Sequence, residues 1–265
     1  MNDLPIQLIS TDFDGTLFAE FENPPVPDRL QELIASLQSQ GAKWVINTGR
    51  DMSSLMETLG RGHLWVEPDY LVLVEREIHL LQDSQYVGLE EWNQACTAAH
   101  AEVFAQVLPQ LPEAIAWIKS RFRVHIYEDA FSPFCLIASN NGDADIIHEY
   151  LDDFCSRVPG LVLVRNDIYA RFSHQAFNKG SALSEIARRI GVPRERVFAI
   201  GDHLNDISML TREHAGYVAA PANAIPLVKT RVTQQAGFVS RFGHGAGVAE
   251  ALEHILSGKG SGGRG

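Results

Sequence analysis

The chain has 265 residues, with 22 Lys and Arg against 33 Asp and Glu, and therefore a formal net charge of -11. This excess of acid opposes non-specific binding to nucleic acid, which requires cationic side chains that neutralise phosphates. Hydrophobic residues make up 45% of the chain, enough for a buried core, but no apolar run reaches the length of a membrane-spanning helix.

The first part of the chain alternates short apolar runs with amphipathic segments, which is the pattern of an α/β sheet. Strands are predicted at residues 6–10, 44–46 and 70–74. A helix that begins at Pro27 joins the first two strands, and a helix through residues 55–59 joins the second pair. Short connections of this kind predict a βαβαβ unit with parallel strands and right-handed crossovers.

Between residues 82 and 172 the predicted strands become shorter, and several adjoin one another without a helix between them. This pattern indicates an α+β insert with antiparallel strand pairs. After Lys179 the alternation of helix and strand returns. The elements expected there are a helix through 183–190, a strand at 196–200, a short helix through 209–210, a strand at 217–219 and a final helix through 248–255.

The sequence therefore predicts a doubly wound, mostly parallel, Rossmann-like α/β sheet with an inserted α+β domain. Residues 1–81 and 173–257 are assigned to the sheet domain, and residues 82–172 to the insert. Residues 258–265 are mostly Gly and Ser and are expected to form a disordered tail. Because open parallel sheets bind ligands beyond the carboxyl ends of their strands, the residues that follow the strands are the candidates for a functional site.

The first strand is followed by Asp12-Phe13-Asp14-Gly15. Alternate side chains of an extended segment share a side, so Asp12 and Asp14 can face one pocket. Two carboxylates this close repel each other, and a divalent cation with oxygen ligands relieves the repulsion. An Asx turn explains the same residues equally simply. A calcium-binding loop is excluded, because Leu17 occupies the position that requires Gly.

Three later strand-to-helix junctions also carry polar groups. Thr48 and Gly49 precede a helix, where free N–H groups suit a phosphate oxygen, although an ordinary Thr N-cap is the simpler interpretation. Lys179 opens another helix and is either a solvated surface residue or paired with a countercharge. Asp202 ends a buried strand, where an unpaired charge is costly, so a metal or lysine partner is expected.

Taken in order, these segments resemble the four motifs of the haloacid dehalogenase-like (HAD) hydrolase superfamily. The chain is most similar to the Cof-type, class IIB phosphatases, which carry a C2-type cap domain. The matching segments are residues 12–17, 47–50, 179–183 and 201–206. The insert matches the cap only in length and position. Relatives often have Asn-Gly at the end of the third strand, where this chain has Glu75-Arg76.

The resemblance implies a Mg²⁺-dependent phosphatase, a phosphoric monoester hydrolase that works in two steps. Asp12 would attack phosphorus and form an aspartyl-phosphate, and Asp14 would act as the acid and then the base. Mg²⁺ would be bound by Asp12, by the backbone carbonyl of Asp14 and by Asp202. Asn205 and Asp206 would orient these ligands.

The resemblance also assigns the phosphoryl oxygens to Thr48, Gly49 and Lys179. It implies a small phosphomonoester as the substrate, a sugar phosphate or a related metabolite, and Arg76 is a candidate contact at the rim of the site. A phosphotransferase or phosphomutase that uses the same aspartyl-phosphate is the alternative. A receiver-like signalling module fits poorly, because such modules lack both a large insert and the second carboxylate, here Asp14.

The remaining features indicate the partners and the compartment. Three cysteines without a C-x-x-C pair favour buried core residues in a reducing compartment over a disulfide framework or a zinc site. The N-terminus has no signal-peptide pattern, so a cytoplasmic protein is expected. We expect no nucleic-acid partner, no membrane association and no obligate protein partner.

Overall fold

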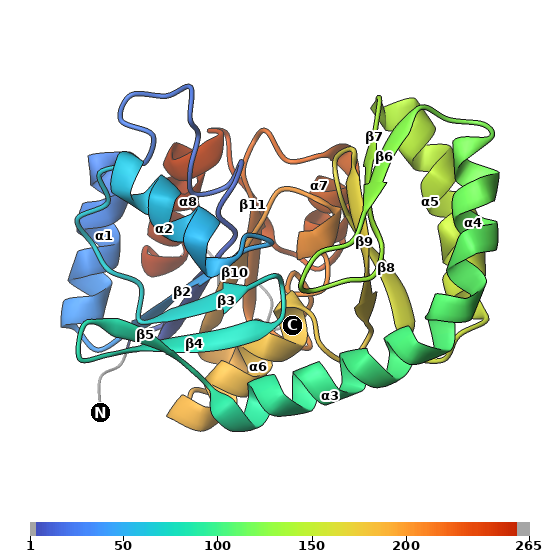
Figure 1. The fold of residues 1–265 in the computed structure, drawn as a ribbon. Coiled ribbons are helices and arrows are strands. Elements are labelled where there is room, and N and C mark those ends of the chain that lie inside the picture. Colours follow the sequence, from blue (N-terminus) through green and yellow to red (C-terminus); the bar gives the residue numbers. More distant parts are fainter. Residues whose placement is uncertain (1–3, 259–265) are drawn as a thin grey trace. The chain divides into compact units, whose positions relative to one another are not determined.

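The computed structural model describes residues 4–258, whose helices and strands are drawn in Figure 1. The chain divides into two compact units, one of residues 1–89 and 179–265 and the other of residues 90–178. The insert was predicted to span residues 82–172. The first unit extends instead to residue 89, because a hairpin that follows its third strand belongs to it. Apart from Gly258, the predicted tail lies outside the described residues.

The first unit contains an eight-stranded sheet with the order β12-β11-β10-β1-β2-β3-β4-β5. Its strands are β1 (Leu8–Thr11), β2 (Lys43–Asn47), β3 (Tyr70–Leu73), β4 (Glu77–Gln82), β5 (Gln85–Gly88), β10 (Val197–Ile200), β11 (Tyr217–Ala220) and β12 (Phe238–Val239). Its helices are α1 (Asp28–Ser39), α2 (Met52–Arg61), α6 (Lys179–Ile190), α7 (Pro226–Gln234) and α8 (His244–Leu256), with 3₁₀ turns at Arg194–Arg196 and Leu204–Asp206.

Six neighbouring strands of this sheet, from β12 to β3, run parallel, and β4 and β5 add an antiparallel hairpin at one edge. The chain order runs outward from β1 in both directions, to β3 on one side and through β10 to β12 on the other. This reversal is the mark of a doubly wound sheet, so the predicted fold class is confirmed. The hairpin of β4 and β5 is an element that the sequence analysis did not predict.

One face of the sheet packs against helices through a continuous apolar core. Trp44, Phe198 and other strand residues contact apolar side chains of α1, α2 and α8, among them Ile34 and Leu252. These positions alternate along the strands with residues on the opposite face, as expected for a sheet that is covered on both sides. The buried strands therefore end in fixed positions, which aligns the loops that follow them.

The second unit is a smaller α+β structure, as the sequence predicted for the insert. Its four strands form an entirely antiparallel sheet with the order β6-β7-β9-β8. Phe172 of the strand at 169–174 stacks on Phe134, which directly precedes the strand at 135–138, and both pack against the helices. The elements are α3 (Glu90–Val107), a 3₁₀ turn (Leu108–Gln110), α4 (Leu111–Lys119), β6 (Val124–Tyr127), β7 (Cys135–Ala138), α5 (Asn141–Ser156), β8 (Leu161–Asn166) and β9 (Tyr169–His174).

The short helix predicted through residues 209–210 is wrong. The chain forms a 3₁₀ turn at Leu204–Asp206 before this position, and residues 207–209 continue as hydrogen-bonded turns and not as a helix. The side chain of Asp206 caps the start of this turn by accepting hydrogen bonds from the N–H groups of Asp202 and His203 at 2.8 and 2.9 Å. The backbone bonds that follow close over three residues, from Ile207 to Leu204 at 3.2 Å and from Met209 to Asp206 at 2.9 Å, which is the spacing of 3₁₀ turns.

No helix in the part of the chain that the structure describes is both long enough and apolar enough to cross a membrane.

The N-terminus of α2 provides a test of local structure. Asp51 caps this helix by accepting a hydrogen bond from the N–H of Ser54 at 2.8 Å. Replacing Asp51 with Ala leaves that N–H without its cap, and we expect a loss of about 1 kcal/mol in the free energy of unfolding. Urea denaturation measures the change. The control is Ser53→Ala on the same helix, which should have almost no effect; an equal loss in both variants would contradict the capping role.

Candidate active site

The site lies where the winding direction of the sheet reverses. β1 pairs with β2 on one side and with β10 on the other, in a register that places Thr11 opposite both Ile46 and Ile200. The pairing continues one residue further, since the N–H of Asp12 donates to the carbonyl of Ile200 at 3.0 Å. The segments after β1, β2 and β10 therefore meet at one edge, the position where doubly wound sheets bind ligands.

A buried lysine connects two of these segments. The Lys179 ammonium donates to Asp12 Oδ1 at 2.6 Å and to Asp206 Oδ1 at 2.7 Å. Lys179 and Asp206 are fully buried and Asp12 is almost so. Lys179 is therefore not a solvated surface residue, and the countercharge that its position required is present. A buried charge of this kind is tolerated only because it is paired and hydrogen-bonded.

The charges in this cluster shift one another's pKa values. Burial raises the pKa of Asp12 well above its ordinary value and the neighbouring Asp206 raises it further, while Lys179 opposes both. Burial alone would lower the pKa of Lys179, but the carboxylates of Asp12 and Asp206 outweigh burial and raise it. Burial, with Asp206, also raises the pKa of Asp202 to about 6. The three carboxyl groups thus carry more negative charge than one lysine neutralises.

The donor set fits a hard divalent cation. Asp12, Asp202 and Asp206 each offer an oxygen, and these oxygens lie within 4.8 Å of one another. Both oxygens of Asp206 already accept hydrogen bonds, from Lys179 and from the turn after β10. Asp12 and Asp202 are therefore better placed to bind a cation, and Asp206 to orient them. Mg²⁺ prefers such oxygen ligands, and it would relieve the repulsion that raises the carboxyl pKa values.

The loop after β1 closely approaches Asp202. Thr16 Oγ1 donates to Asp202 Oδ1 at 2.8 Å. A Cβ atom at Gly15 would lie only 2.7 Å from Asp202 Oδ2, and the φ of Gly15 is +80°. Only glycine meets both conditions without strain, because it has no Cβ and adopts positive φ readily. The small residue thus brings the loop and the carboxylate together.

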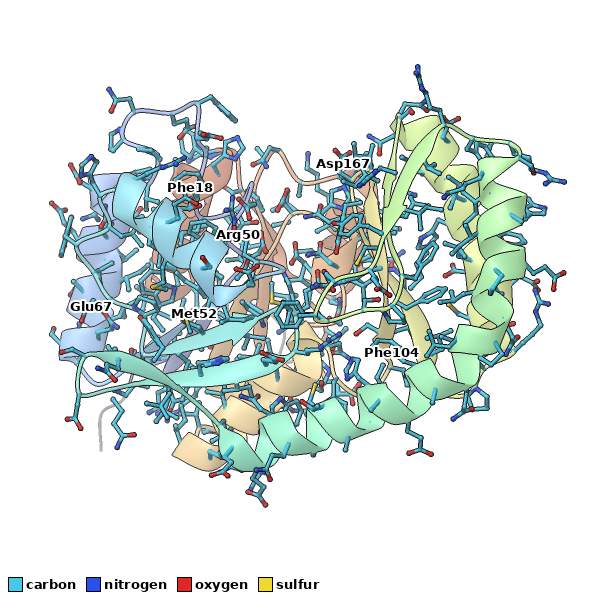
Figure 2. The ribbon with its side chains drawn as sticks, in the orientation of Figure 1. Phe18, Arg50, Met52, Glu67, Phe104 and Asp167 are labelled. Carbon is cyan, nitrogen blue, oxygen red and sulfur yellow. The ribbon has the colours of Figure 1, made fainter. Side chains whose placement is uncertain are left out.

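Asp14 lies outside the buried cluster and is half-exposed. Both of its oxygens accept hydrogen bonds at 2.7 Å from Arg50, one from Nε and one from Nη2. The third nitrogen of Arg50 donates to Ser54 Oγ at 3.0 Å and to Thr58 Oγ1 at 2.7 Å, and Figure 2 labels Arg50 beside α2. Arg50 is the last residue of the second motif, but no role was predicted for it. Its place in that motif is the feature of the sequence that could have indicated a role.

Thr48 is not a helix cap, so that interpretation was wrong. α2 begins at Met52 and its cap is Asp51, because the chain makes a short loop before the helix. Thr48 is buried in this loop, and its hydroxyl accepts a hydrogen bond from the N–H of Arg50 at 3.1 Å. Nearby, the amide of Asn47 donates to the backbone carbonyl of Lys179 at 3.0 Å. The loop after β2 is thereby joined to the start of α6.

The predicted rim residue Arg76 is buried, and its neighbour Glu75 reaches a site residue. Asn205 Nδ2 donates to Glu75 Oε1 at 3.0 Å. Asn205 Oδ1 is buried and has no hydrogen-bond partner within residues 4–258. In the sequence Glu75 stood out only as part of a departure from related sequences, and the contact at the rim of the site was predicted for Arg76.

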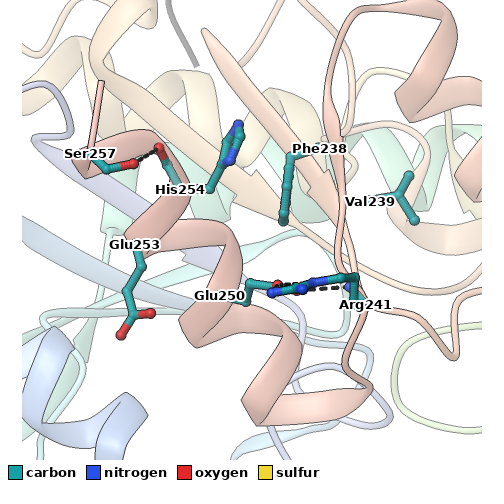
Figure 3. A pocket seen from close by; sticks show the side chains of 7 residues that line it. All are labelled: Phe238, Val239, Arg241, Glu250, Glu253, His254 and Ser257. Carbon is teal, nitrogen blue, oxygen red and sulfur yellow. Dashed lines mark hydrogen bonds and ion pairs between the residues drawn. The ribbon is translucent and has the colours of Figure 1, made fainter. Parts of the chain in front are cut away.

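A separate pocket of about 430 Å³ lies on the first unit between β12 and α8 (Figure 3). Phe238 stacks on His254 at 4.2 Å between ring centroids, and Arg241 pairs with Glu250. The complete lining is Phe238, Val239, Arg241, Glu250, Glu253, His254 and Ser257. None of the motif residues lines this pocket, so it plays no part in the chemistry considered below.

Known proteins resemble the chain over most of its length. A 5-amino-6-(5-phospho-D-ribitylamino)uracil phosphatase of Bacillus subtilis is 26% identical over 268 residues, which covers 95% of this chain and 96% of that protein. A phosphoglycolate phosphatase of Methanothrix thermoacetophila is 30% identical over 143 residues, 54% of this chain and 60% of that protein. The predicted class of enzyme, a phosphatase, is confirmed by these relatives.

A solved structure and a family profile were also compared with the chain. The sucrose-phosphatase of Synechocystis, in complex with sucrose and phosphate, superposes with a TM-score of 0.70 over 94% of this chain and 98% of that one; at 18% identity the likeness shows the fold alone. The profile of haloacid dehalogenase-like hydrolases matches residues 9–70 and 118–252. With most of its length matched, the chain belongs to the haloacid dehalogenase-like hydrolase family.

Proposed function

We propose that the chain is a Mg²⁺-dependent phosphatase that hydrolyses a small phosphomonoester through an aspartyl-phosphate on Asp12. The observation that carries the proposal is the buried cluster at the end of β1. There Asp12 contacts Lys179 at 2.6 Å and shares a possible cation site with Asp202. A nucleophilic carboxylate, a cation for the phosphate charge and an ammonium group are the components that phosphoryl transfer needs.

In the first step, a carboxylate oxygen of Asp12 attacks phosphorus, and the bond to the leaving oxygen breaks. Asp14 gives a proton to that oxygen, and in the second step it takes a proton from the water that cleaves the aspartyl-phosphate. In the structure each oxygen of Asp14 accepts one hydrogen bond from Arg50 and keeps a second lone pair, which can carry the proton. Arg50 thus acts as a positioning residue for Asp14.

Mg²⁺ would be held by Asp12, by the backbone carbonyl of Asp14 and by Asp202, with Asn205 and Asp206 orienting these groups. When bound, it supplies positive charge that offsets the charge on the phosphoryl oxygens. The raised pKa of Asp202 and the three converging oxygens support this assignment.

Thr48, Gly49 and Lys179 are proposed to bind the phosphoryl oxygens. Lys179 lies 2.6 Å from the proposed nucleophile, so an oxygen on the attacked phosphorus would lie within reach of the ammonium. Backbone N–H groups and a lysine that are fixed in advance stabilise developing charge without reorganising. Arg76 remains a candidate for contact with the rest of the substrate.

The substrate is proposed to be a sugar phosphate or a related small metabolite. The two phosphatases that the chain resembles in sequence support this class, since their names specify phosphoglycolate and a phosphorylated ribitylaminouracil. The alternative is a phosphotransferase or phosphomutase that passes the same phosphoryl group to a hydroxyl. Release of inorganic phosphate in the absence of an acceptor distinguishes hydrolysis from transfer.

Replacing Asp12 with Asn should abolish turnover, because an amide oxygen is a poor nucleophile for phosphorus. We expect kcat to fall by at least about four orders of magnitude in a phosphate-release assay over a panel of sugar phosphates. Asp83→Asn, on the turn between β4 and β5, is the control and should keep full activity. Near-normal turnover by the Asp12 variant would exclude Asp12 as the nucleophile.

Added Mg²⁺ should raise the Tm of the wild-type protein by a few degrees, because a ligand that binds only the folded state stabilises it. The gain should shrink as the pH falls through about 6, since the pKa of Asp202 lies there and the protonated carboxyl no longer binds the cation. Without metal the pH dependence of stability has the opposite sign. The pKa of Asp202 is raised in the folded protein, so its protonated form favours folding at low pH. This stabilisation is lost as the pH rises through about 6. Thermal scans with and without Mg²⁺ measure both effects. An Asp202→Asn variant that retained the full gain would rule out Asp202 as a ligand.

Arg50→Lys keeps the positive charge but loses the two-pronged contact with Asp14. We expect kcat to fall by roughly 10- to 100-fold with a much smaller change in KM, because proton transfer is affected more than substrate binding. Steady-state kinetics on the best substrate gives both constants. Arg61→Lys, at the exposed end of α2, serves as the control, and equal effects in the two variants would refute the positioning role of Arg50.

A further inference from the structure

The turn between β3 and β4 has an unusual backbone. Val74 and Glu75 have φ angles of 45° and 68°. Positive φ is uncommon for residues other than Gly, Asn and Asp, and for a β-branched residue such as Val it is a true outlier. Conformations of this kind are strained, and they persist where the surroundings hold them in place.

The loop after β2 holds this turn. The N–H of Val74 donates to the carbonyl of Arg50 at 3.0 Å, and the N–H of Glu75 donates to the carbonyl of Thr48 at 2.9 Å. The strained turn is thus docked on the segment that is proposed to bind phosphate. Strain that is retained at a functional site suggests that the conformation has a use.

The use that the geometry indicates is to carry the Glu75 carboxylate into the site. Its Oε1 accepts the hydrogen bond from Asn205 at 3.0 Å. The same oxygen would lie 3.2 Å from a Cβ atom on Gly49, so the carboxylate sits directly against the second motif. Its charge also reaches Lys179, where it helps to raise the pKa of the ammonium. Glu75 is therefore an anion placed among groups assigned to the phosphoryl group.

We propose that Glu75 is an internal competitor of phosphate. Its carboxylate holds the amide of Asn205 in the phosphate-free site, and its negative charge opposes an incoming phosphate dianion. The Lys179 ammonium attracts a phosphate dianion as it attracts the Glu75 carboxylate, and Glu75 also lies against Gly49, so the two anions compete for the same positively charged region. The consequence is weaker binding of inorganic phosphate, the product, and hence its faster release. This inference rests on the proposed function, because it takes the site to be a phosphate site.

The test is the affinity for inorganic phosphate, measured by isothermal titration calorimetry at saturating Mg²⁺. Glu75→Gln removes the charge and keeps the shape of the side chain. Glu75→Gly removes the whole side chain and also suits the backbone, because glycine adopts a φ near 68° without strain. Removing one unit charge beside Gly49, which is assigned to the phosphoryl group, should lower the Kd for phosphate by roughly tenfold in both variants. The control is Glu77→Gln, on β4 just beyond the turn, for which the Kd should not change.

A Kd that is unchanged or higher in either Glu75 variant would overturn the inference, and so would the absence of phosphate binding in all the proteins. A tenfold decrease with the Glu77 control unchanged would support it. The outcome is separable from that of the proposed function, which is judged by phosphate release from wild-type protein. Wild-type turnover with no effect of Glu75 on the Kd would leave the phosphatase and remove the competitor. Tighter phosphate binding by the Glu75 variants, without any turnover by the wild-type protein, would support the competitor role and exclude the phosphatase function.

Discussion

The structure of the site depends on neutralising one buried ammonium group. Lys179 has no exposed surface, and it satisfies its charge only by lying between Asp12 and Asp206. Asp12 is 167 residues away in the sequence, so the ion pair forms only when the sheet has brought β1, β10 and α6 together. A lysine left without these partners in the interior would cost several kcal/mol. The same interaction that completes the fold therefore places a carboxylate at a fixed distance from a cationic group.

Other contacts extend this arrangement outward. Asp206 uses its second oxygen to close the turn after β10, which sets the position of Asp202. Asp202 in turn accepts the hydroxyl of Thr16, next to the glycine that lets the first loop approach. Charge is distributed unevenly over this network, with carboxylates in excess. That excess is unfavourable without a cation and becomes favourable once a divalent cation is bound.

The fold class could be predicted because short apolar runs followed by polar residues are a property of neighbouring positions. The roles proposed for Asp12, Thr48, Lys179 and Asp202 came from the resemblance to the family's four motifs, since each segment taken alone allowed a simpler interpretation. The contacts of Arg50 with Asp14 and of Glu75 with Asn205 could not be predicted, because they join separate segments whose approach depends on the whole sheet. The short helix expected at 209–210 is replaced by turns, because the backbone hydrogen bonds there close over three residues, as from Met209 to Asp206. Glu75 lies in a turn that contains no glycine, so the residue types in the turn did not indicate its positive φ.

The hydrogen bond between Asn47 and the carbonyl of Lys179 has a consequence for how the lysine is held. Lys179 is the first residue of the sheet unit after the chain returns from residues 90–178. Asn47, on β2, binds its backbone carbonyl at 3.0 Å, while Asp12 and Asp206 bind its ammonium. Both ends of the lysine are thus held by groups of the sheet unit itself, and none of these contacts involves a residue of 90–178.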